Sequence, residues 1–261
     1  MGIHLTAAAL PIGPMAPAAV DAVLAESTAV VGWPAADVLS WRPTVTTFEL
    51  TGALPPATEA RHRELSLAAG ASLLNLRVLI RVLGLHPAVR MLPDPDRPEL
   101  LAVVRPQGIR VISSEDRLMA AGIVLGAAQG RAADSRKDRA AVTTALPDNL
   151  LGLLQRAAKV EHGWVAVIPD EPTDLRPTGS LLASAGEPVA MGLIVVIGTV
   201  LDSPVARLQA GQAMQRALLT ATINGVVARP DPAALGQPAA RATVRELIGG
   251  GLWPQAVLRL G

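Results

Sequence analysis

Gly70-Ala-Ser-Leu-Leu-Asn-Leu-Arg-Val-Leu-Ile-Arg-Val-Leu-Gly84 and Gly211-Gln-Ala-Met-Gln-Arg-Ala-Leu-Leu-Thr-Ala-Thr-Ile-Asn-Gly225 are the two stretches that decide the fold of this chain. Both run from glycine to glycine over the same length, and a Pro-Asp-Pro sequence follows each of them closely, at 93–95 and 230–232. Apolar residues occupy nearly every face of each stretch, which is typical of a helix buried in a core or at an interface. The pair therefore predicts two related halves packed together, because the spacing is far longer than a solenoid repeat. The alternative is two ordinary buried helices with coincidental glycine ends.

The remaining segments alternate between helical and strand-like patterns in mixed order, which predicts the α+β class. We expect a first half over residues 1–112 and a second half over 113–261, packed as one globular unit. Ser203 and Pro204 have the residue types of an N-cap and a first helical position. The expected helices are Ala18–Ala25, Glu64–Leu83, Asp116–Gln129, Asn149–Lys159, Pro204–Ile223 and Arg241–Leu247. The expected strands are Val45–Leu50, Ala88–Leu92, Leu100–Val104, Ile109–Ile112, Trp164–Ile168, Val189–Thr199 and Pro254–Leu260, with 171–188 as a loop.

Two of these expectations concern packing. Leu100–Val104 and Ile109–Ile112 are predicted to pair as a short hairpin, because Pro106 and Gly108 lie between them. The two long helices are predicted to pack together at the centre of the core. On those helices we expect nearly complete burial of Leu74, Leu76, Leu218 and Leu219.

The composition narrows the possible functions. Half of the 261 residues are hydrophobic, which is enough for a large core. The net charge is +1, the basic residues are scattered and tyrosine is absent, so nucleic acid is not an expected partner. The lack of cysteine excludes disulfides and thiolate chemistry, and the four histidines lie too far apart in sequence to predict a metal site. The content of Ala, Arg and Pro is typical of a GC-rich genome, such as an actinobacterial one.

No segment predicts a membrane location. The longest apolar run, Val189–Leu201, is too short to span a bilayer and suits a strand buried on both faces. The amino terminus has no basic cluster, and Pro11, Pro14 and Pro17 interrupt its apolar stretch, so a signal peptide is not expected. A cytoplasmic protein is the resulting expectation.

The usual catalytic signatures of hydrolases, nucleotide-binding proteins and zinc proteases are missing. The densest charged stretch is Ser135-Arg-Lys-Asp-Arg139. Arg136 and Arg139 would share one face of a helix and could bind a phosphate bidentately. With Lys137 between them, they suit an anionic cofactor, and a solvated helix face is the alternative.

Three segments resemble the nitroreductase-like flavoproteins of the Acg type. They are Arg63–Arg77 with its continuation Arg90–Pro98, then Asp202–Ala221, and finally Trp253–Gly261. The resemblance implies a nitroreductase-like fold, in which two halves form an internal pseudo-dimer around long buried helices and mixed sheets. Such a pseudo-dimer already buries the surface that separate subunits would share, so a monomer or a weak dimer is expected.

The resemblance also implies a site for FMN. Arg136, Lys137 and Arg139 fall where the family holds the flavin phosphate and ribityl chain. Trp41 and Arg42 resemble the end of a first-half loop that contacts the flavin. Gln212 and Arg216 lie nearby on the second interface helix. In this family the flavin takes a hydride from NAD(P)H and passes it to a nitro or quinone acceptor, so the resemblance names no catalytic side chain.

The chain departs from the family in ways that leave a second hypothesis open. The Pro-Ser and His-Asn elements before Trp41 are missing, the connection between the Trp164 and Ile194 strands is short, and Gly261 is not followed by the usual tail. At most one flavin per chain is therefore expected. The alternative is a non-catalytic descendant that sequesters flavin, binds another small molecule or serves as a structural partner.

Overall fold

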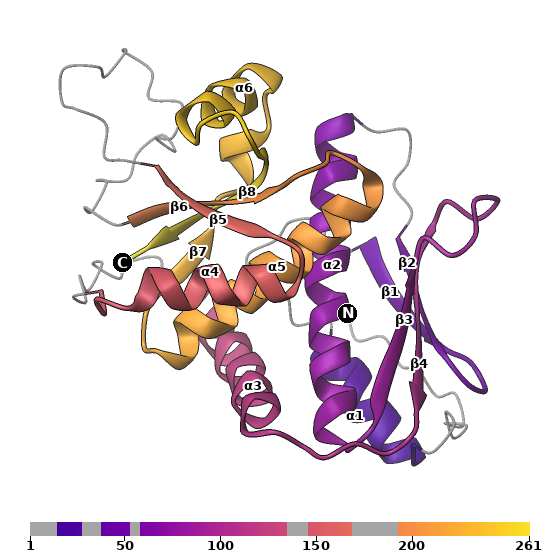
Figure 1. Cartoon of the computed structure of the whole chain (residues 1–261). Helices are drawn as coiled ribbons and strands as arrows, with labels where there is room; N and C mark the ends of the chain where they lie inside the picture. The colour runs from indigo at the N-terminus through magenta and orange to yellow at the C-terminus, as the bar shows by residue number, and fades with distance from the viewer. Residues whose placement is uncertain (1–14, 28–37, 53–57, 135–145, 169–192) are drawn as a thin grey trace.

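The computed structural model describes residues 15–27, 38–52, 58–134, 146–168 and 193–261. Within these ranges the protein has the α+β class that the sequence predicted. The expectation of mixed sheets is wrong for the described strands, because all of them pair antiparallel in two four-stranded sheets. Figure 1 shows the long helices α2 and α5 crossing at the centre, with one sheet on the α2 side and the other on the α5 side. The core therefore lies around the helix pair, between the two sheets.

The two sheets have the same strand order. The first is β1-β2-β4-β3, and the second is β5-β6-β8-β7. In each sheet a register shift interrupts the pairing of the two central strands, between Leu50 and Thr51 in β2 and between Ile197 and Gly198 in β6. The strands are β1 Leu39–Pro43, β2 Phe48–Gly52, β3 His86–Met91, β4 Leu100–Gln107, β5 Trp164–Ile168, β6 Leu193–Thr199, β7 Ala228–Pro230 and β8 Trp253–Leu260.

Two long helices form where the sequence predicted them. Helix α5 begins at Pro204, and the Ser203 side chain accepts a hydrogen bond from the Ala206 backbone at 3.2 Å, as an N-cap does. Helix α2 begins before the expected Glu64 because Thr58 caps it. The helices are α1 Pro17–Ser27, α2 Glu59–Val82, α3 Ser114–Asp134, α4 Leu150–Val160, α5 Pro204–Ile223 and α6 Pro238–Leu247, with a 3₁₀ turn η3 at Pro232–Leu235.

Helices α2 and α5 touch backbone to backbone. A Cβ atom placed on Gly70 would lie 2.9 Å from the Cα of Gly211, and one placed on Gly211 would lie 2.9 Å from the Cα of Gly70. Each would come closer still to a carbonyl oxygen of the opposite helix, that of Leu208 or of Leu67. Only glycine permits this approach, because any side chain would push the two helices apart.

The two long helices also end alike. Gly84 and Gly225 follow them with φ angles of 76° and 73°, in the left-handed region that glycine adopts without strain. The backbone N–H groups of the next residues, Leu85 and Val226, bond back to carbonyls in the last helical turns at 3.3 and 3.0 Å. The glycine ends noted in the sequence are therefore helix stops.

Most of the predicted core is confirmed. Leu74 and Leu76 are fully buried and Leu219 is 3% exposed, whereas Leu218 is only partly buried at the edge of the core. Helix α2 is long and apolar enough to cross a membrane, but 72% of its most apolar window is buried inside the protein. That burial is what a core helix of a soluble protein shows.

The predicted hairpin at 100–112 is wrong. Strand β4 continues through Pro106 to Gln107 and pairs with β3, where Pro106 faces Pro87. Two prolines can face each other in an antiparallel ladder only where a pair exchanges no backbone hydrogen bonds, so Pro106 does not end the strand. Residues 109–112 form no strand. A hairpin does form between β1 and β2, and the sequence analysis did not predict strand β1. The predicted loop at 171–188 and the start of the Val189–Thr199 strand lie outside the described residues.

Candidate functional site

A group of polar side chains lies at the junction of α2, α3, α4 and α5, and we call it the interface cluster. Gln212 and Arg216 belong to it, and they share one face of α5 because they are four residues apart. Glu161 joins it because α4 ends at Val160 and leaves this residue as the C-cap. Arg77 of α2 and Glu115 of α3 complete the cluster.

The carboxylate of Glu161 connects the two long helices. Its Oε1 accepts from Nε of Arg216 at 3.0 Å, and its Oε2 accepts from Nη1 of Arg77 at 2.5 Å. The Arg77 guanidinium also donates to the Gln212 side-chain oxygen, and Arg216 donates to Glu115 Oε1 at 2.6 Å. The side chains of Glu161 and Arg216 are each only 4% exposed. Buried charges persist when they are paired in this way.

The electrostatics keep the cluster ionised. Burial by itself would raise the pKa of Glu161, but Arg77 and Arg216 outweigh burial and hold this pKa below its usual value. Glu161 is therefore a carboxylate at neutral pH and is saturated by two guanidinium groups. It is suited to joining α2, α4 and α5, and it is not suited to exchanging protons.

Arg81 adds a further positive charge beside this cluster. It lies one helical turn after Arg77 on α2 and is half-buried. Burial lowers the pKa of Arg81, and the nearby Arg77 and Arg216 lower it further, while Glu161 and Asp116 act in the opposite direction. Among the residues that the structure describes, Arg81 has no carboxylate within 4.0 Å. Arg81 therefore adds positive charge to a region that already contains the carboxylates of Glu161 and Asp116.

The structure brings only part of the predicted flavin site together. Gln212 and Arg216 meet in the interface cluster. Trp41 instead lies in the core of the first half, where its Nε1 donates to Ser72 Oγ at 2.8 Å. Arg42 points away from that core, as alternation along β1 requires, and pairs with Glu49 of β2. The predicted phosphate-binding residues Arg136, Lys137 and Arg139 lie outside the described residues.

The sequence analysis missed Arg77, Arg81, Glu161 and Glu115. A signal for two of them was present, because a charged residue within an otherwise apolar helix requires a buried partner. The pattern could not show which partner, since Glu161 comes from a helix end elsewhere in the chain. Within the described ranges, no three His, Asp or Glu side chains are grouped closely enough to hold a metal ion.

Comparisons with known proteins add no assignment. No protein-family model matches the chain, and no curated protein matches it significantly.

Proposed function

We propose that this protein is a fused pseudo-dimer of the nitroreductase-like kind. The carrying observation is that the order α1-β1-β2-α2-β3-β4 is repeated as α4-β5-β6-α5-β7-β8, with η3 and α6 inserted before β8. The strand order and the position of the register shift repeat as well. Unrelated halves would have no reason to share all three features.

The contact between the long helices supports the same proposal. An interface with a twofold axis is isologous, so that a residue of one half meets the equivalent residue of the other. Gly70 and Gly211 make this kind of contact, and each glycine also faces the carbonyl oxygen three residues earlier on the opposite helix. The sequence resemblance and the reciprocal contact of Gly70 with Gly211 are independent observations, and both support the proposal that the two halves share a common ancestor.

For the activity, we propose a non-catalytic small-molecule-binding protein. The observation behind this choice is the pairing of Gln212 and Arg216, which the flavin hypothesis assigned to FMN. Arg216 is buried and paired with Glu161 and Glu115, while Gln212 is also buried and accepts from Arg77. Side chains held in this way strengthen the interface and are not free to orient a cofactor.

The second candidate is an FMN-dependent oxidoreductase that uses NAD(P)H. The feature that favours it is the basic segment Arg136–Arg139, which falls where the resembled family holds the flavin phosphate. Arg136, Lys137 and Arg139 would supply the positive charge for an FMN phosphate. The flavin would then carry the chemistry.

Spectroscopy and titration separate these two candidates. We expect freshly purified protein to show no flavin absorbance band, and we expect NAD(P)H to stay unoxidised when FMN and a quinone are added. Tight FMN binding with NAD(P)H consumption would overturn the non-catalytic proposal. In that event, Arg136→Met should weaken FMN binding, and the matched change Arg105→Met at an exposed position on β4 should not.

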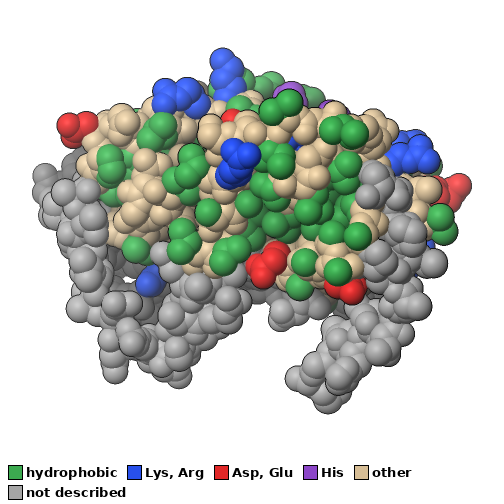
Figure 2. All heavy atoms as spheres, turned by 90° about the horizontal axis from the view of Figure 1, so that it is seen from below, with side chains coloured by type: hydrophobic (Ala, Val, Ile, Leu, Met, Phe, Trp, Pro, Cys, Tyr) green, Lys and Arg blue, Asp and Glu red, His purple; other side chains and the backbone are tan. Residues whose placement is uncertain are grey.

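The pseudo-dimer proposal has its own test in the oligomeric state. We expect light scattering to give the mass of one chain, 26.9 kDa. Helix α3 offers the surface through which a dimer would most readily form, because its side chains Leu118, Val124 and Leu125 are each more than half exposed. Figure 2 shows hydrophobic side chains gathered on the lower face of the molecule. A stable dimer would mean that the internal helix pair does not replace a contact between chains.

A further inference from the structure

A cleft opens at the opposite end of α2 from the interface cluster. It lies between the start of α2 and helix α6, and its volume is about 440 Å³. That volume is in the usual range for small-molecule sites. Its charged and aromatic lining consists of Glu59, Arg63, Arg241, Arg245, Glu246 and Trp253.

Arg63 is the most unusual residue in this lining. It is 8% exposed, and its Nη2 donates to Glu59 Oε1 at 3.1 Å. Its Nε is buried and has no acceptor among the described residues. Burial lowers the pKa of Arg63, and the neighbouring Arg241 and Arg207 lower it further. A guanidinium nevertheless keeps its proton in proteins, so this wall holds a buried cation whose hydrogen bonds are incomplete.

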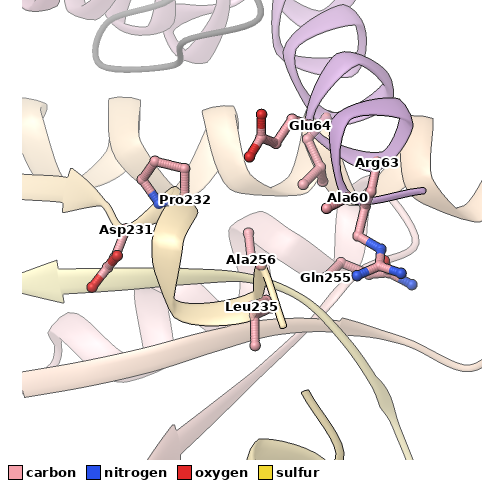
Figure 3. Close-up of a pocket in the computed structure, with 10 residues that line it drawn as sticks. Ala60, Arg63, Glu64, Asp231, Pro232, Leu235, Gln255 and Ala256 are labelled. Carbon is pink, nitrogen blue, oxygen red and sulfur yellow. The ribbon is translucent and has the colours of Figure 1, made fainter. Parts of the chain in front are cut away.

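The same residue also borders a smaller pocket behind the cleft. Figure 3 shows the Arg63 side chain extending from α2 toward Gln255, with Ala60 and Glu64 on the same helix. Arg63 therefore lines both hollows.

Arg241 is held rigidly on the wall of the cleft. Its Nη1 donates to Asp202 Oδ2 at 2.7 Å, and its Nε donates to the backbone oxygen of Pro254 at 2.9 Å. Asp202 also accepts from Arg207 at 3.1 Å. Burial would raise the pKa of Asp202, but the hydrogen bonds from Arg241, Arg207 and Gln255, together with the charge of Arg241, outweigh burial and hold this pKa well below its usual value, so the anchoring carboxylate stays charged. A cation fixed in this way needs little reorganisation to bind an anion.

Arg245 completes the wall by stacking on Trp253. Its guanidinium carbon lies 3.8 Å from the ring centroid, and its Nε donates to the Gly250 backbone oxygen at 3.2 Å. No carboxylate within the described ranges lies within 4.0 Å of it. A guanidinium that stacks through its face keeps the donors at its edge available for a ligand.

From this arrangement we propose that the cleft binds a small anionic metabolite through an oxyanion group, either a phosphate or a carboxylate. Arg245 can present the N–H groups at the edge of its guanidinium to two oxygens of such a group. The charges of Arg63 and Arg241 would attract the anion, while the Arg241 guanidinium itself is held by Asp202, Pro254 and Gln255. Glu59 accepts from both Arg63 and Arg207, at 3.1 and 3.0 Å, and its side chain is 69% exposed, so an anion that enters the cleft would compete with it for Arg63. The site lies away from the interface cluster and does not depend on flavin binding.

Titration with inorganic phosphate and with succinate tests this proposal and distinguishes the two oxyanions. We expect saturable heat in calorimetry for at least one of them, together with a change in tryptophan fluorescence that Trp253→Phe removes. Arg245→Met should weaken the binding at least tenfold, since it removes charge-assisted donors. Arg63→Met should weaken it similarly, and Arg105→Met should leave it unchanged.

Two results would overturn the proposal. One is the absence of saturable binding of either anion at concentrations up to about 10 mM. A dissociation constant above that concentration would be weaker than that of ordinary metabolite sites. The other is an affinity that Arg245→Met leaves unchanged, since this partly exposed residue can be replaced without disturbing the core. Thermal melting of the Arg63→Met variant shows whether its result reflects binding or folding. Neither result bears on the pseudo-dimer or on flavin binding, which have separate tests.

Discussion

Replacing Gly211 with alanine tests the central helix crossing. The added Cβ would lie 2.9 Å from the Cα of Gly70, about 1 Å short of a normal carbon–carbon contact. It would also press on the Leu67 carbonyl oxygen, which is backbone and cannot rotate away. In an ordinary helix interior the same change stabilises by about 1 kcal/mol. Here the overpacking should cost roughly 1–3 kcal/mol of stability, and more if the backbone must move, so the cost should exceed that gain.

We therefore expect Gly211→Ala to lower the free energy of unfolding by about 2 kcal/mol, and its melting temperature by roughly 4–8 °C. Urea denaturation followed by circular dichroism measures the first value, and thermal melting measures the second. Gly152→Ala on α4 is the matched control, because its Cβ would meet only the end of the Arg156 side chain, at 3.9 Å. That control should be neutral or stabilising, by up to about 1 kcal/mol.

The double variant Gly70→Ala/Gly211→Ala refines the test. Once one Cβ has separated the helices, the second meets less resistance, so the combined loss should be smaller than the sum of the single losses. A Gly211→Ala protein as stable as the wild type would refute the reasoning, since the two backbones could not then be in contact at this point.

Three further predictions concern charge. Glu161→Gln should lower the unfolding free energy by about 3–5 kcal/mol in urea, because it leaves Arg77 and Arg216 buried without their carboxylate; a change below about 0.5 kcal/mol would be inconsistent with the pairing. The folded-state pKa of Asp202 is lowered from 3.8. Its carboxylate therefore contributes stability above about pH 4, and this contribution is lost as the pH falls through the lowered pKa. Asp202→Asn should accordingly flatten the profile of unfolding free energy against pH, measured between about pH 5 and pH 2. If FMN binds at all, replacing both Arg136 and Arg139 with alanine should weaken the affinity for FMN by about two orders of magnitude or more. An equally tight affinity in the double variant would mean that the phosphate binds elsewhere.

The sequence by itself determined the local elements of this protein. Helix α5 has the predicted bounds because Pro204, Ser203 and Gly225 are signals that act within one or two helical turns. The burial of Leu74 and Leu76 followed from an apolar pattern on all faces of the helix. The α+β class followed from the alternation of such segments, which needs no knowledge of how they pack.

Only the tertiary structure decided which residues meet. The contact of Gly70 with Gly211 depends on where two helices cross, and the sequence showed these glycines only as the starts of similar stretches. Strand β4 continues through Pro106 because its partner β3 supplies a site that needs no N–H donor, which is a property of the register. The ion pairs of Glu161 and the arginine-lined cleft join elements that are far apart in the chain. The physical reason is the same in each case: periodicity and caps act over a few residues, whereas a buried charge, a close approach or a strand register is specified by its partner.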